Sequence, residues 1–90
     1  MEFHEEANRI CLLDEAGKTL AEVTFSQEGE DLELDHTFVD PSLAGRGIAG
    51  KLVEAAAEKL RREGRKARIT CSYAVHWFEK NPQWADVVKP

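Results

Sequence analysis

Three runs of mainly apolar residues along the first half of the chain read as β-strands, and in the third run Leu32, Leu34 and Phe38 share the period of two that is typical of a strand face. The runs are Asn8 to Asp14, Thr19 to Ser26, and Leu32 to Val39. Between them, the segments Asp14-Glu15-Ala16-Gly17 and Gln27-Glu28-Gly29-Glu30 each contain a glycine, which is typical of a tight turn. Three consecutive strands joined in this way predict an antiparallel meander.

After Val39 the spacing of apolar residues changes, and from Ile48 onward they recur at about every fourth position. Apolar residues form a single stripe at Ile48, Leu52, Ala56 and Leu60, with Ala49 and Val53 beside them. This pattern predicts an amphipathic helix from Ile48 to Arg62 that packs its stripe against the sheet. Gly64 stands where a glycine commonly ends a helix.

The last third of the chain predicts one more strand and a second helix. Ala67 to Cys71 reads as a fourth strand, and it is expected to run parallel to Leu32–Val39 because a helix separates the two. Ser72 is expected to cap a shorter helix that ends at Asn81-Pro82. A final packed segment of undetermined form contains Trp84, Val87 and Val88. The predicted fold class is mixed α+β.

Composition narrows the function classes. The 90 residues suffice for one domain with a modest core, and a net charge of -5 disfavours nucleic-acid binding. No apolar run is long enough to span a membrane, and Met1 to Glu6 does not resemble a signal peptide. Cys11 and Cys71 lack zinc-ligand spacing, so no metal is expected; Cys11 is expected in the core. A reducing, cytoplasmic setting is the expectation.

The stretch Pro41 to Leu52 carries the most information about chemistry. It contains Gly45 and Gly47 and lies between a predicted strand and a predicted helix. Backbone N–H groups of such a turn, at the positive end of a helix dipole, suit a phosphate or pyrophosphate. The alternative is that the glycines only make a tight turn.

Three segments together carry a family resemblance. Gly45-Arg46-Gly47-Ile48-Ala49, then Cys71-Ser72-Tyr73, then Trp77-Phe78-Glu79-Lys80-Asn81-Pro82 are similar to a short, single-domain subfamily of GNAT-type N-acetyltransferases. The resemblance extends from about Asn8 to Trp84. Ser42 departs from the superfamily signature, which has Gln or Arg there.

This resemblance implies a truncated GNAT-like acyl-CoA N-acyltransferase fold, in which a meander is followed by a helix and a parallel strand. It implies acetyl-CoA as cosubstrate and an amine or protein segment as acceptor. The pantetheine arm is expected between two splayed strands. The implied cofactor-binding residues are Phe38 and Val39 for the pantetheine amides, and Ala44, Gly45, Arg46, Gly47, Ile48 and Ala49 for the phosphates. The basic run Arg61 to Lys66 is either a solvated helix end or a contact for the 3′-phosphate.

Three residues are candidates for catalysis. Cys71, at the end of a predicted strand and before a helix, is a nucleophile, a proton donor to the leaving thiolate, a redox-sensitive thiol or a small packing residue. His36 is a general base or a core residue; Leu32, Leu34, His36 and Phe38 are expected to share one face of their strand. Tyr73 is a general acid or a packing residue.

The expected mechanism is direct attack of an amine on acetyl-CoA, with catalysis mainly from positioning and from backbone donors on the thioester carbonyl. Ordinary GNAT enzymes have a longer N-terminal region that builds the acceptor site. About thirty residues precede the third strand here. Two further functions therefore stay open: an acetyl-CoA sensor with little turnover, and a protein-interaction domain without the cofactor.

Overall fold

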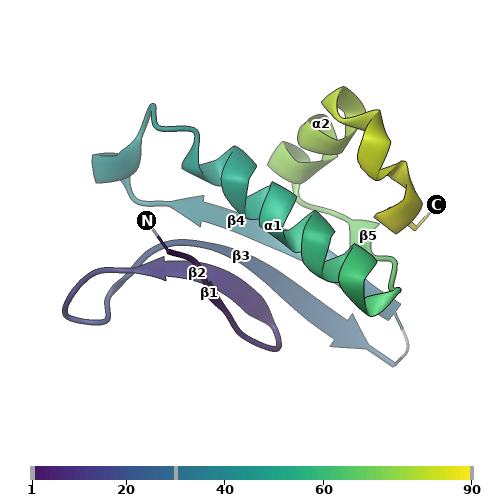
Figure 1. Ribbon diagram of the computed structural model, residues 1–90, viewed down its shortest axis with the longest axis horizontal. Coiled ribbons are helices and arrows are strands. Elements are labelled where there is room, and N and C mark those ends of the chain that lie inside the picture. Colours follow the sequence, from purple (N-terminus) through teal and green to yellow (C-terminus); the bar gives the residue numbers. More distant parts are fainter. Residues whose placement is uncertain (1, 30, 90) are drawn as a thin grey trace.

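Five strands form one sheet, and their order in the sheet is their order in the chain (Figure 1). The computed structural model describes residues 2–29 and 31–89. The strands are β1 (His4–Glu5), β2 (Arg9–Leu13), β3 (Thr19–Glu28), β4 (Asp31–Val39) and β5 (Arg68–Ile69). The helical elements are η1 (Pro41–Leu43), α1 (Ile48–Glu63), α2 (Ser72–Lys80) and η2 (Pro82–Val87). This architecture confirms the mixed α+β class.

The meander is antiparallel from β1 to β4, and β2, β3 and β4 correspond to the three consecutive strands that the sequence predicted. The first predicted turn is held by Asp14, whose Oδ1 accepts hydrogen bonds from the backbone N–H of Ala16 at 2.8 Å and of Lys18 at 2.9 Å. An aspartate at the start of such a turn accepts hydrogen bonds from backbone N–H groups of the turn, which would otherwise have no acceptor in the protein. β1 was not predicted, because two residues give no measurable alternation.

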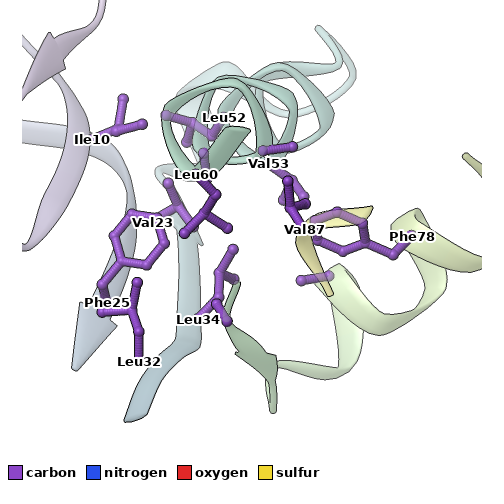
Figure 2. Close-up of a cluster of buried hydrophobic side chains, with 14 of the residues drawn as sticks. Ile10, Val23, Phe25, Leu32, Leu34, Leu52, Val53, Leu60, Phe78 and Val87 are labelled. Atoms are coloured by element: carbon purple, nitrogen blue, oxygen red, sulfur yellow. The ribbon is translucent and has the colours of Figure 1, made fainter. Parts of the chain in front are cut away.

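Both helices lie on the same face of the sheet (Figure 1). α1 runs along the centre of this face, and its buried side chains meet those of the strands. Figure 2 shows Leu52, Val53 and Leu60 of α1 directed toward side chains that rise from β2, β3 and β4. The core so formed buries the predicted helical stripe, including Ile48 and Ala56. In the part of the chain that the structure describes, no helix is long and apolar enough to cross a membrane.

The basic end of α1 is held by acidic partners. Gly64 ends the helix with φ 67°, and its N–H donates to the Leu60 and Arg61 carbonyls. Arg61 contacts Asp86 in η2, and Arg62 Nη2 lies 2.5 Å from Glu5 Oε1 in β1. These arginines lie in the last turn of the 16-residue helix α1, at the opposite end from the glycine loop. The arrangement therefore supports the structural interpretation of the basic run.

The fourth predicted strand is shorter than expected. Ala67 to Cys71 was predicted, but only Arg68–Ile69 pairs with β4, in the expected parallel direction. Both Thr70 and Cys71 direct their backbone N–H groups to one acceptor, the Leu34 carbonyl, at 3.1 and 3.3 Å. Since one carbonyl receives both donors, the chain has already turned away from β4 at this point.

The final segment closes the outer edge of β5. η2 occupies the place where a packed segment was expected, and Val87 is buried in the core. The Ala67 N–H donates to the Val87 carbonyl at 3.0 Å, and the Lys89 N–H donates to the Ala67 carbonyl at 2.8 Å. These bonds satisfy backbone groups that an edge strand would otherwise expose.

Candidate active site

A β-bulge at Asp35 sets the geometry of the site. Thr24 on β3 pairs with His36, while the next residue, Phe25, pairs with Leu34, so Asp35 has no residue opposite it. The Thr24 hydroxyl donates to Asp35 Oδ1 at 2.7 Å and fastens the bulge. An extra residue in one strand reverses the facing of every side chain that follows it.

The bulge overturns one prediction from the sequence. Leu32 and Leu34 are buried under the helices, but His36 and Phe38 do not share their face, because each is displaced by one position. Phe38 instead pairs with Glu22 on the face without helices and is 37% exposed. His36 is likewise exposed on that face. Its role as a general base stays a prediction that this orientation does not favour.

The residue brought into the site is Thr37, which sequence analysis missed. Thr37 pairs with the buried Val23 and so faces the helices. Its Oγ1 lies 3.4 Å from Cys71 Sγ, within hydrogen-bonding distance for sulfur. Cys71 is half-buried and is the N-cap of α2, while Ser72, the predicted cap, is the first residue of the helix. The capping prediction was therefore wrong by one position.

The surroundings of Cys71 favour the thiolate. Burial alone raises the pKa of its thiol, but the hydrogen bond from the Thr37 side chain opposes this effect. Backbone N–H groups of Ala74, Tyr73 and Thr37 act in the same direction as that side chain, and the pKa falls below its ordinary value. As the N-cap residue, Cys71 lies at the positive end of the α2 dipole, which favours the charged form of its thiol.

The environment of Cys11 disfavours the thiolate, in contrast to that of Cys71. It is fully buried on β2, and burial raises the pKa of its thiol. Its Sγ lies 3.6 Å from Glu6 Oε2, and it pairs across the sheet with Glu22. It is thus buried on the face without helices, whereas the core under α1 lies on the other face. Of the two thiols, Cys71 is the one suited to chemistry.

Tyr73 extends from α2 toward the first turn of α1. A Cβ atom placed on Gly50 would lie 3.3 Å from the Tyr73 hydroxyl and 3.5 Å from Trp77 Nε1. Gly50 therefore permits the close approach of α1 and α2, a role that sequence analysis did not assign. The Tyr73 side chain is 42% exposed, and its predicted role as a general acid is not tested by this position.

The glycine loop enters α1 through a left-handed residue. Gly47 is the N-cap, with φ 70° and ψ 20°, and Gly45 has φ 82°. A Cβ atom at either position would meet nothing within 4 Å. Both glycines are thus required by their left-handed backbone conformation and not by the close approach of other atoms.

Several N–H groups of this loop lack an acceptor. Ala44 donates to the Pro41 carbonyl at 3.1 Å, and Arg46 donates to the Leu43 carbonyl at 3.4 Å, so these two predicted phosphate contacts are already engaged. Among the residues that the structure describes, the four other predicted phosphate contacts have no acceptor for their backbone N–H groups: Gly45, Gly47, Ile48 and Ala49. They lie at the positive end of the α1 dipole, which suits an anionic ligand.

The edge of β4 beside these groups is also open. The Asp40 N–H donates to the Leu20 carbonyl, so by alternation the backbone of Phe38 belongs to the β3 ladder. Thr37 and Val39 direct their backbone groups to the other edge, where β5 has already diverged. Of the two residues predicted to contact a pantetheine arm, Val39 directs its backbone groups to this open edge and Phe38 does not; Thr37 directs its backbone there as well.

Known proteins similar to this chain include Protein NATD1 of vertebrates. The Xenopus tropicalis and human proteins are each 36% identical to it over 61 residues, which is 66% of this chain. The match spans about half the length of these curated relatives, 56% of the frog protein and 54% of the human one.

The solved structures include a close match in fold. The NMR solution structure of a GCN5-like protein from Staphylococcus aureus has a TM-score of 0.77 and 31% sequence identity, covering 98% of this chain and 87% of that one. The model of the GCN5-related N-acetyl-transferase family matches residues 9–87, from β2 to the end of η2. The chain belongs to the GCN5-related N-acetyltransferase family.

Proposed function

We propose that this protein binds acetyl-CoA and transfers the acetyl group to an amine. The observation that carries the proposal is the set of four N–H groups without an acceptor at the start of α1, in a chain of this family. We assign the phosphates to Gly45, Gly47, Ile48 and Ala49. The pantetheine amides are assigned to the open edge of β4 at the Thr37 carbonyl and at Val39, where they would pair as an added strand does.

Cys71 is the proposed reacting group. Because the pKa of its thiol is lowered, it is better suited to attack than to donate a proton to the leaving group. In this route the Cys71 sulfur bonds to the acetyl carbonyl carbon, the carbon–sulfur bond of acetyl-CoA breaks, and the CoA thiolate takes a proton from water. The amine then attacks the acetyl-Cys71 carbonyl, its proton passes to water, and the Cys71 thiolate is restored.

Calorimetric titration with acetyl-CoA tests the first step. We expect binding in the micromolar range, and a weaker interaction for the variant Gly47→Ala. Absence of binding at millimolar acetyl-CoA would refute both the transferase and the sensor, and would leave a protein-interaction domain.

Mass spectrometry tests the second step. Brief incubation with acetyl-CoA should add one acetyl group to Cys71, and this adduct should disappear when a suitable amine is added. Cys71→Ser is the matched control, since an adduct on another residue would persist in it. Binding without an adduct, and without acetylation of any amine in a broad panel, would favour the sensor instead.

A further inference from the structure

We propose that Thr37 is a positioning residue for Cys71, whose hydroxyl and backbone N–H hold the sulfur as a thiolate where β4 and β5 separate. The two residues are 34 positions apart in the chain, and their side chains meet at 3.4 Å. Thr37 is positioned by β4 and Cys71 by the start of α2, so two separate elements fix the contact.

The bulge at Asp35 makes this contact. Without the extra residue, position 37 would face away from the helices, and position 36 would face Cys71. The Thr24 hydroxyl bonds to Asp35 on the outer face and so stabilises the register from the opposite side of the sheet. Because of the bulge, the neighbour of the Cys71 thiol is the Thr37 hydroxyl and not the His36 imidazole.

The chemistry of this neighbour suits a thiolate. A threonine hydroxyl donates one hydrogen bond and carries no charge, so it stabilises an anionic sulfur without accepting its proton. The Thr37 N–H adds a second donor from the same residue. Hydrogen bonds to a charged group are stronger than those between neutral groups, so their loss should be measurable.

The contact is tested by the pH dependence of alkylation with iodoacetamide, in a Cys11→Ala background where Cys71 is the one remaining cysteine. For the folded parent protein, the midpoint should lie below that of the same chain unfolded in urea. Thr37→Val should raise the midpoint by about one unit, a tenfold change in the thiolate equilibrium. Thr37→Ser should stay near the parent, because it keeps the hydroxyl.

Thr19→Val is the matched control, since it removes a hydroxyl from β3 away from Cys71 and should leave the midpoint unchanged. Circular dichroism checks that each variant is folded, and Thr37→Ala replaces Thr37→Val should the latter not fold. Equal midpoints for the parent and the hydroxyl-free variant would overturn the inference, as would an equal shift in Thr37→Ser. So would a folded parent midpoint no lower than that in urea.

The place of Thr37 in acetyl transfer rests on the proposed function, whereas alkylation needs no acetyl-CoA. If acetyl-CoA does not bind but the midpoint shifts as expected, the proposed function fails and the role of Thr37 stands. If acetyl-CoA binds and reacts but the midpoint does not move, Thr37 is not the positioning residue. In an active protein, Thr37→Val should shift the pH profile of kcat upward and leave the KM for acetyl-CoA unchanged.

Discussion

Arg61 forms a bidentate ion pair with the Asp86 carboxylate, with Nε 3.0 Å from Oδ2 and Nη2 2.5 Å from Oδ1. The same guanidinium lies 4.0 Å from the centre of the Trp84 ring and donates through Nη2 to the Gln83 carbonyl at 2.8 Å. The Arg61 side chain at the end of α1 therefore contacts three residues of η2 and holds this element beside the edge of the sheet.

Arg61→Ala should lower the Tm and speed hydrogen exchange at the Lys89 N–H, because η2 loses its tether. Arg61→Lys should recover only part of the loss, since an ammonium makes neither the two-oxygen contact nor the flat stacking on Trp84. Thermal unfolding and hydrogen exchange measure both. Unchanged exchange at Lys89 in Arg61→Ala would show that η2 is held by its own packing.

The stabilisation that the Arg61–Asp86 ion pair contributes should decrease as the pH falls. The hydrogen bond from Arg61 holds the pKa of Asp86 below its ordinary range, so the stabilisation is present above that range. It should be lost as the pH falls through the usual aspartate range toward the lowered pKa. The Tm difference between the wild type and Arg61→Ala should therefore shrink from pH 7 to pH 3. A constant difference would assign the effect to contacts that do not titrate, the stacking on Trp84 and the hydrogen bond to the Gln83 carbonyl.

Gly47→Ala should destabilise the protein by about 1–2 kcal/mol, because alanine is strained in the left-handed conformation of this residue. Gly47→Asn should cost less, since asparagine tolerates that region better. Urea unfolding compares the two. No loss of stability in Gly47→Ala would mean that the loop adopts another conformation in solution.

Cys71→Ala should reduce the kcat for acetyl transfer by about 100-fold or more and leave the Kd for acetyl-CoA unchanged, because the thiol is assigned to the reaction and the loop to binding. Cys11→Ala is the control, and it should retain activity, as this thiol is buried on the other face. Full turnover in Cys71→Ala would return the mechanism to direct attack by the amine.

His36→Ala should retain nearly full activity, because His36 is exposed on the face without helices. A general base typically contributes about 100-fold or more to a rate, so its loss would be evident in steady-state kinetics. A decrease of that size would restore His36 as the base and would require the acceptor to approach from the outer face.

Local patterns were sufficient for most of the fold. The stripe from Ile48 to Leu60 identified α1, and Gly64 marked its end, because both signals act within a few residues. The length of β5 was not predictable in this way. It depends on where the chain leaves β4 after α1, which is a property of packing between distant segments.

The candidate site was predictable only where its residues carry local sequence signals. The glycine loop and Cys71 carry local signals, but the facing of β4 depends on the bulge at Asp35. The sequence leaves the register ambiguous after Leu34. Three polar residues, Asp35 to Thr37, interrupt the alternation, and the apolar residues that follow occupy both phases, Phe38 in phase with Leu34 and Val39 out of phase. Alternation read without that shift directs attention to His36 and away from Thr37.

The consecutive order of the strands bears on how the chain folds. Each strand from β2 to β4 pairs with its immediate predecessor, so the meander needs only short loop closures and should form early. The contact between Thr37 and Cys71 spans 34 positions and waits for α1 and β5 to dock. On a ribosome, the meander can therefore assemble while Cys71 is still being synthesised, and the thiol meets Thr37 only in the last stage of folding.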